Sequence, residues 1–176
     1  MNNIKEMKLY SDAYRIFKDL KALGYSEDDK LSLEDVNQFD QLHYHGTLSV
    51  QEAIETINIQ ENDNVLEIGA GWGGPSRYIA YKTRANVSAL ELQEDYSEVG
   101  KELTLRTGLQ RFVTHINQDF LNFSQKSPCF HKIVSWLALY HIPYRKIYTN
   151  KLFNLLHKNG MLFIEDLTFG SGFESS

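Results

Sequence analysis

The chain alternates short apolar runs with longer stretches in which apolar residues recur every three or four positions. The short runs have the composition of strands that are covered on both faces of a sheet. Strands that alternate with amphipathic helices are typical of parallel βαβ units. The pattern therefore predicts an α/β domain with five strands, at 65–68, at 87–91, at 112–116, in the segment opened by Phe130, and at 161–164.

Capping residues and helix breakers predict where the helices lie. Ser, Asp and Asn favour the position just before a helix, and Pro favours its first turn. A Glu three residues after the cap strengthens the signal, as Glu98 does after Asp95. The expected helices span about 9–23, follow Ser32, run through 50–57, follow Asp95, and start at Pro143.

The segment 65–75 reads as a buried strand that enters a glycine-rich turn and then a helix. Glycine lets the backbone adopt positive φ and come close to a ligand, and a helix N-terminus favours a polar or anionic group. The spacing Gly69-x-Gly71-x-x-Gly74 also fits the dinucleotide fingerprint. The loop therefore predicts a nucleotide-like cofactor, and its glycines alone do not distinguish a dinucleotide from other nucleosides.

Acidic residues follow three successive strands and narrow the choice of cofactor. Glu67 lies two positions before the first glycine, where its carboxylate would repel a pyrophosphate and attract an ammonium group. Glu91 ends the second strand, where a carboxylate can accept both ribose hydroxyls. Asp119 follows the third strand, within reach of an adenine edge. Each acid alone could be a solvated strand-end residue, but three in succession favour a nucleoside site.

These motifs resemble those of class I methyltransferases that use S-adenosylmethionine (SAM), and the resemblance covers the chain from about Val50 onward. It is strongest to the small-molecule branch, with the sarcosine, dimethylglycine, phosphoethanolamine and sterol methyltransferases and the cyclopropane synthases. The runs 40–47 and 135–143 are also similar to the methyltransferase domain of ovothiol-synthesising enzymes. The resemblance implies a SAM site made by Glu67, Gly69, Ala70, Gly71, Trp72, Gly73, Glu91, Leu92, Asp119, Phe120 and Trp136.

The resemblance also implies a Rossmann-like, doubly wound, mostly parallel sheet. Residues 1–49 would form an N-terminal helical cap, and 50–176 would form the SAM-binding core. The family fold normally adds a helix and an antiparallel hairpin after the fifth strand, and here the chain ends in the flexible-looking tail 170–176. We therefore expect strands six and seven to be missing. A fragment of a longer enzyme is the favoured explanation, and a partner that covers the open sheet edge is the alternative.

Methyl transfer needs a base only if the acceptor arrives protonated, because the sulfonium methyl is already activated. His141 is the first candidate, since it follows the fourth strand and resembles the histidine that phosphoethanolamine methyltransferases carry there. It could instead cap the helix at Pro143. Tyr44 and His45 are the next candidates, because the loop before the third helix commonly closes over the methyl donor. They could equally belong to a packed connector.

Four aromatic residues could surround a methylated cation: Trp72, Trp136, Tyr140 and Tyr44. Core packing is the simpler interpretation of each one taken singly. The six histidines show no HExxH spacing, so the sequence indicates no metal site.

Composition favours one soluble domain. With 176 residues, 42% hydrophobic and 23% charged, the chain is large enough for a core. A net charge of −5 leaves no basic stripe for nucleic acid. Cys129 is the only cysteine, which excludes an internal disulfide. The N-terminus is too polar for a signal peptide and no apolar run approaches about 18 residues, so we expect a cytoplasmic protein without stable membrane association.

The sequence thus predicts transfer of a methyl group from SAM to a small polar metabolite, at an amine or imidazole nitrogen. Carbon methylation of a lipid or sterol-like acceptor is the alternative within the same chemistry. A nicotinamide-dependent oxidoreductase agrees with the glycines but not with Glu67, and a non-catalytic SAM-binding module is the third alternative. The oligomeric state stays open.

Overall fold

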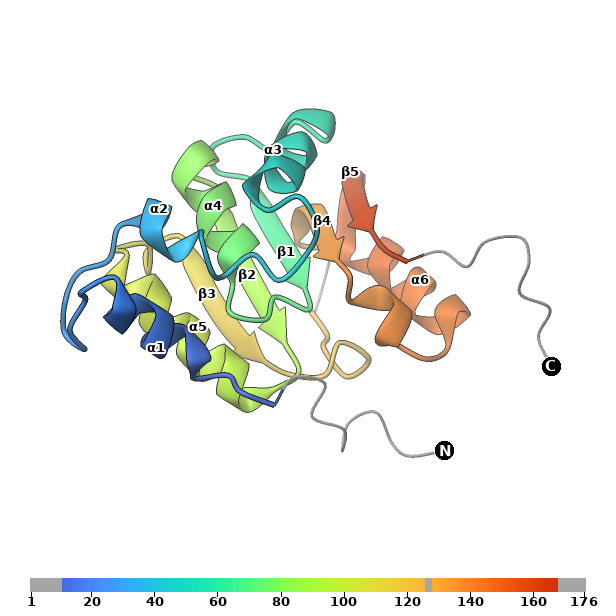
Figure 1. Ribbon diagram of the computed structural model, residues 1–176. Coiled ribbons are helices and arrows are strands. Elements are labelled where there is room, and N and C mark those ends of the chain that lie inside the picture. Colours follow the sequence, from blue (N-terminus) through green and yellow to red (C-terminus); the bar gives the residue numbers. More distant parts are fainter. Residues whose placement is uncertain (1–10, 126–127, 168–176) are drawn as a thin grey trace.

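The computed structural model of the protein describes residues 11–125 and 128–167, and it contains one five-stranded parallel sheet (Figure 1). The strand order is β3-β2-β1-β4-β5, and every neighbouring pair is parallel. This confirms the predicted α/β, Rossmann-like sheet. The strands are β1 (Asn64–Ile68), β2 (Asn86–Glu91), β3 (Val113–Asn117), β4 (Phe130–Trp136) and β5 (Leu156–Glu165).

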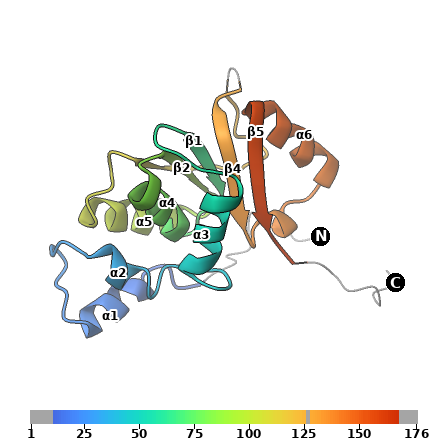
Figure 2. The same cartoon turned by 90° about the horizontal axis from the view of Figure 1, so that it is seen from above.

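Helices cover both faces of this sheet. Figure 2 shows α3, α4 and α5 on one side and α6 on the other, with α1 and α2 packed outside α4 and α5. None of the helices in the described ranges is long and apolar enough to cross a membrane. The helices are α1 (Arg15–Ala22), α2 (Leu33–Val36), α3 (Thr47–Thr56), α4 (Gly74–Thr83), α5 (Glu94–Arg106), the 3₁₀ turn η2 (Leu139–His141) and α6 (Arg145–Leu155).

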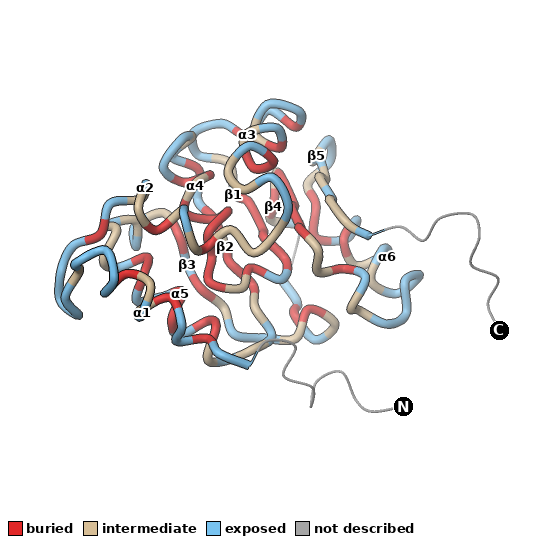
Figure 3. The backbone as a smooth tube through the Cα atoms, in the orientation of Figure 1, coloured by how far each residue is buried: buried red, intermediate tan, exposed pale blue. Residues whose placement is uncertain are grey.

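The period of two along β1 sends alternate side chains to opposite faces. Val65 joins the cluster beneath α3 and α4, whereas Leu66 and Ile68 join the cluster that contains Leu152 of α6. Figure 3 shows the buried backbone concentrated along the strands and the inner faces of the helices. Because β1 is central, the loop that follows it is held from both sides.

Two helix boundaries differ from the prediction. Helix α5 starts at Glu94 after Gln93, so Asp95 lies inside the first turn and is not the cap. Helix α6 starts at Arg145 rather than Pro143, because η2 uses 139–141 and the chain needs a connector before the next helix. Both errors come from treating the first suitable residue as the boundary, whereas the path of the preceding loop decides it.

The cap on α2 and the apolar face of α1 are confirmed in part. The Ser32 hydroxyl accepts a hydrogen bond from the Asp35 backbone N–H at 3.0 Å. On α1, Ile16 and Leu20 are buried, but Tyr14 and Leu23 are about half exposed. The predicted start of this helix near residue 9 and the tail 170–176 lie outside the described residues.

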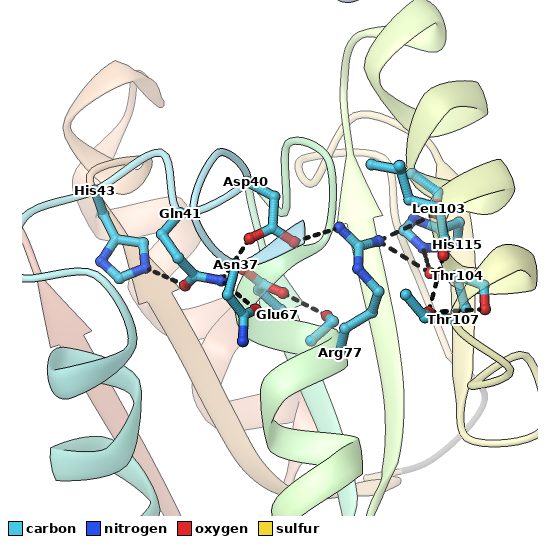
Figure 4. A network of polar contacts seen from close by, with 12 residues as sticks. Asn37, Asp40, Gln41, His43, Glu67, Arg77, Leu103, Thr104, Thr107 and His115 are labelled. Carbon is cyan, nitrogen blue, oxygen red and sulfur yellow. Dashed lines mark hydrogen bonds and ion pairs between the residues drawn. The ribbon is translucent and has the colours of Figure 1, made fainter. Parts of the chain in front are cut away.

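A buried ion pair fastens the N-terminal segment to α4 (Figure 4). Arg77 donates to the Asp40 carboxylate at 2.8 Å, and neither side chain has any exposed surface. The other end of the guanidinium donates to the Thr104 hydroxyl and to the Gly100 carbonyl on α5. Arg77 therefore joins three elements that are far apart in the sequence.

Histidine extends this network beneath the glycine loop. The His115 ring lies 2.8 Å from the Thr104 hydroxyl, and burial lowers the pKa of His115 to about 3. A Cβ at Gly73 or Gly100 would lie within 2.6 Å of this ring. The neutral imidazole therefore fills the space that these two glycines leave.

The first prediction tests the ion pair. Asp40→Asn keeps the shape of the side chain but leaves the Arg77 charge buried without its counter-ion. The free energy of unfolding should fall by about 3–5 kcal/mol. Urea denaturation measures the loss. The matched control is Asp12→Asn, because the Asp12–Lys18 pair is exposed at both ends and should leave the midpoint unchanged. Equal midpoints for Asp40→Asn and the wild type would contradict the importance given to the pair.

Candidate active site

The main cavity opens at the carboxyl ends of the strands, where the chain order reverses. From β1 the sheet continues to β2 and β3 on one side and to β4 and β5 on the other. Ligands of open α/β sheets bind at such a switch point. The cavity has a volume of about 520 Å³, and its wall is built from the ends of β1, β2 and β4 and the loops that follow them, together with the loop after β3 and the segment 40–43.

Most of the predicted site residues meet in this cavity. Its wall includes His141, the first catalytic candidate, and nine of the eleven residues expected to hold the cofactor: Glu67, Gly69, Ala70, Gly71, Glu91, Leu92, Asp119, Phe120 and Trp136. These residues come from four different strand ends and are brought together only by the fold.

Trp72 and Gly73 do not line the cavity, contrary to the expectation for the glycine loop. The Trp72 side chain is fully buried on the opposite side of the loop, where it stacks on Tyr96 at 5.2 Å between ring centroids. Its indole N–H donates to the Ala13 carbonyl at 2.9 Å. Trp72 therefore anchors the N-terminal segment and cannot belong to an aromatic box in the cavity.

The loop comes close to its neighbours because glycine is present. Gly69 has φ +73°, and a Cβ there would lie 2.2 Å from the Ala138 Cβ. Gly74 has ordinary backbone angles, but a Cβ there would lie 2.4 Å from the Asp40 carbonyl oxygen. The loop is thus wedged between the residues after β4 and the N-terminal segment.

Backbone N–H groups of the loop bond within the protein. Gly69 and Ala70 both donate to the Leu90 carbonyl, at 2.9 and 3.0 Å, and Gly73 donates to the Ala70 carbonyl at 2.7 Å. Gly71 donates to the Glu91 carboxylate at 2.7 Å. These four groups are not free to cradle a pyrophosphate, which supports a nucleoside without phosphates.

Glu91 ends β2 with its carboxylate fixed at the cavity wall. One oxygen accepts from the Gly71 N–H, and the other accepts from the Gln93 N–H at 2.8 Å. Burial raises the pKa of Glu91, and the two backbone donors oppose that shift. Each oxygen keeps a second lone pair, so the carboxylate is still able to accept the two hydroxyls of a ribose.

Glu67 is almost completely buried, with 2% of its surface exposed. Its carboxyl accepts a hydrogen bond from the Ser76 hydroxyl on α4. Burial raises the pKa of Glu67 to about 8, although the Ser76 hydrogen bond and the Arg77 charge oppose the shift.

Asp119 lies in the loop after β3 and shapes the far end of the cavity. Its carboxylate accepts from the Leu121 N–H at 2.9 Å and from the Asn122 amide at 3.3 Å. The neighbouring Phe120 is 4% exposed and packs into the apolar cluster near α6. An apolar ring beside a carboxylate suits a flat heterocycle with hydrogen-bond donors at its edge.

Of the three catalytic candidates, only His141 lines the cavity. Tyr44 and His45 are exposed, and the structure does not bring either to the wall. His141 does not cap α6, whose N-terminal flank is Tyr144. Within the described residues, the His141 ring forms no hydrogen bond; it lies against the Tyr140 ring at 3.7 Å between centroids. Burial lowers the pKa of His141, so the ring is neutral near pH 7.

His43 is a cavity residue that the sequence did not single out. Its ring stacks on Trp136 at 5.5 Å between centroids, and its nitrogens lie 2.9 Å from the Tyr44 carbonyl and 3.0 Å from the Gln41 amide oxygen. Each ring nitrogen of His43 thus lies beside a protein oxygen, and burial lowers the His43 pKa, so the neutral ring donates to only one of the two at a time. The run 40–47 pointed to this loop, but nothing in it showed which histidine turns inward.

The cavity wall is rich in acidic side chains. Four carboxyl residues line it, Asp40, Glu67, Glu91 and Asp119, and no lysine or arginine is among its lining residues in the described part of the chain. Asp40 is paired with the buried Arg77 guanidinium at 2.8 Å. No group of three His, Cys, Asp or Glu residues within 11–125 and 128–167 is arranged to hold a metal ion. The wall therefore favours a cationic ligand.

Comparison with known proteins identifies the family. The family model for mycolic acid cyclopropane synthetase matches residues 37–171. The chain belongs to this family. The match includes the glycine loop, the acids of the cavity wall and His141, and it accounts for SAM as the cofactor.

The curated relatives of this family member are larger proteins. It is 24% identical over 133 residues to methyltransferase GfsG of Streptomyces halstedii, covering 76% of this chain and 48% of GfsG. It is 25% identical over 118 residues to the sterol 24-C-methyltransferase of Eremothecium gossypii, covering 67% of this chain and 32% of that protein. The glycine/sarcosine/dimethylglycine N-methyltransferase of Actinopolyspora halophila is 24% identical over 118 residues, covering 67% of this chain and 21% of that protein. The chain thus spans half or less of each relative.

A solved structure shares the fold. Phosphoethanolamine N-methyltransferase 2 of Haemonchus contortus, in complex with phosphomonomethylethanolamine and S-adenosylhomocysteine, superposes with a TM-score of 0.67 at 18% identity, covering 71% of this chain and 29% of that protein. This agreement supports the fold. The cavity of this chain itself fits SAM. The Glu91 carboxylate is able to accept further hydrogen bonds, the wall is acidic, and N–H groups of the glycine loop are bonded within the protein.

The second prediction concerns Glu91. Glu91→Ala removes the carboxylate that we expect to accept both ribose hydroxyls, and it frees the Gly71 N–H. Hydrogen bonds to a charged group contribute about 1.5–3 kcal/mol each, so SAM affinity should fall at least about tenfold. Isothermal titration calorimetry measures the change. Glu98→Ala, on the exposed face of α5, is the control and should bind SAM like the wild type. An unchanged dissociation constant for Glu91→Ala would place the ribose elsewhere.

Proposed function

We propose that the protein transfers a methyl group from SAM to a nitrogen of a small polar metabolite, an amine or an imidazole. The observation that carries this proposal is the cavity wall, where four carboxyls and the unbonded His141 ring meet without a lysine or arginine among the lining residues of the described chain. An acidic wall attracts an acceptor that arrives as a cation. A neutral histidine beside it is able to take the proton that such an acceptor must lose.

We assign each residue of the wall a role according to the strand end that carries it. Glu91 and Asp119, at the ends of β2 and β3, would hold the nucleoside, and Glu67 at the end of β1 would face the ammonium group of the cofactor. SAM, when bound, supplies a methyl group that is already activated on a sulfonium. Since β4 lies on the other side of β1 from β2, the reacting end of the cofactor would lie beside Trp136 and His141, which line the same cavity.

Proton removal is the step that the chain's own residues supply. An ammonium or imidazolium has no lone pair to attack a methyl group until it loses a proton. His141 would accept this proton on a ring nitrogen, and burial keeps the His141 pKa low enough for the ring to be neutral beforehand. Asp166 would oppose that shift and stabilise the imidazolium once it forms. Trp136 and His43 would close the wall and limit the access of water.

A lipid-like acceptor is the second candidate, and a specific observation favours it. Much of the wall is apolar, with Leu42, Ile68, Leu90, Leu121 and Ile142 among its residues. Relatives of the chain include sterol and sphingolipid C-methyltransferases. A carbon acceptor would use the apolar part of the wall and would approach His141 without an ammonium group.

The experiment that tests the proposal offers both kinds of acceptor to the protein. The protein is incubated with SAM and, in separate reactions, with the polar and the lipid fraction of a cell extract. Mass spectrometry should find products heavier by one methylene in the polar fraction, with the gain on a basic nitrogen. Methylated products in the lipid fraction alone would contradict the nitrogen acceptor. SAM binding without any product would favour the non-catalytic module.

The third prediction assigns the base. His141→Ala should lower turnover of the polar acceptor about 10²-fold or more, with little change in SAM affinity. The defect should shrink as pH rises, because a larger share of the acceptor then arrives deprotonated. The control is His45→Ala, whose exposed side chain does not line the cavity and should leave the pH–rate profile unchanged. A fully active His141→Ala variant would remove His141 from the mechanism.

A further inference from the structure

Glu67 differs from the other acids of the cavity wall in how its charge is compensated. Asp40 has Arg77, whereas Glu91 and Asp119 accept hydrogen bonds from backbone N–H groups of their own loops. Among the described residues, the Glu67 carboxyl receives its hydrogen bonds from Ser76. It is also almost completely buried. An ionised carboxylate in this position lacks the solvation that would stabilise it.

We propose that Glu67 is protonated in the free protein and releases its proton to solvent when SAM binds, so that capture of the cationic cofactor is coupled to proton release. This inference rests on SAM being the ligand of the proposed function. The balance is simple: a neutral carboxyl becomes a carboxylate beside the ammonium group of the cofactor, and one proton leaves. No bond other than the O–H bond is broken.

Arg77 is close enough to influence Glu67 but is not its partner. The guanidinium directs its donors to Asp40, at 2.8 Å, and to the Gly100 carbonyl and Thr104 hydroxyl on α5, at 3.2 and 3.1 Å. Figure 4 shows Arg77 in contact with Asp40 on one side and with Thr104 on the other. The Glu67 carboxyl accepts instead from the Ser76 hydroxyl. The Arg77 guanidinium is therefore paired with Asp40 and not with Glu67.

The remaining surroundings favour the neutral form of Glu67 as well. Its strand neighbours, Ala89 on β2 and Val134 on β4, carry no charge. Glu91 faces it from the end of β2, and the like charge raises the Glu67 pKa further. Burial is the largest cause of the shift to about 8. An ammonium group brought into the cavity would supply the counter-charge that the free protein lacks.

The coupling gives SAM affinity a defined pH dependence. Below about pH 8, binding must remove the proton from Glu67, so each unit of lower pH should weaken binding about tenfold. Above that pH the carboxyl is already ionised, and this dependence should disappear. A SAM site with a permanently ionised acid would show a flat profile between pH 6 and 7.

The experiment counts protons directly. Titrations of SAM into the protein at pH 7, in buffers of different ionisation enthalpy, should show release of nearly one proton per SAM bound. The Glu67→Gln variant keeps the size of the side chain and its acceptor for Ser76, and it should release almost none. The ammonium group of SAM itself titrates near pH 8, and the Glu67→Gln titration corrects for that contribution. Glu98→Gln on the exposed face of α5 should behave like the wild type.

The outcomes separate this inference from the proposed function. SAM binding to the wild type without proton release would overturn the role of Glu67 and leave the SAM site intact. Absence of SAM binding would overturn both. Equal proton release by the wild type and Glu67→Gln would assign the proton to another group. The wild type alone supplies an independent check whether or not the variant folds. Its net proton release should fall through zero near pH 8 and become net uptake by about pH 9, because Glu67 is then already ionised and free SAM has lost its ammonium proton.

Discussion

The ion pair between Asp40 and Arg77 is the contact on which the site depends most. A buried charge is tolerated only when it is paired and hydrogen-bonded, and here each side chain is fully enclosed. Asp40 begins the segment that carries His43 to the cavity, and Arg77 lies in the helix directly behind the glycine loop. This one contact thus fixes the position of the segment 40–43 relative to the glycine loop.

Because Arg77 is paired with Asp40, the cavity wall is acidic overall. The buried Arg77 guanidinium is paired within the network, and the cavity wall keeps acidic residues with no lysine or arginine among its described lining residues. Internal bonding of the loop N–H groups removes the usual means of holding a phosphate. A cationic nucleoside satisfies both conditions, and SAM is such a molecule. The proposed nitrogen acceptor and the proposed proton release rest on the same acidic wall as the binding of the cofactor.

The sequence alone predicted those parts of the site that depend on a short stretch of the chain. The strand at 65–68, the turn after it and the acids at the strand ends could be recognised because a parallel sheet places successive strand ends at one edge. Trp72 was misplaced because the positive φ angles on either side of it, at Gly71 and Gly73, turn the side chain away from the cavity. His43, rather than Tyr44 or His45, faces inward because its ring stacks on Trp136. A contact between residues so far apart in the sequence leaves no trace in periodicity.

Hydrogen–deuterium exchange with and without SAM tests the central claim most directly, because it reports on the glycine loop and on the covering segment in one measurement. If the Asp40–Arg77 pair joins them, SAM should slow exchange at 69–77 and at 37–43 over the same range of concentrations. In Asp40→Asn at temperatures where it remains folded, protection of 37–43 should be lost. Protection of the loop in the wild type with no change at 37–43 would contradict the account.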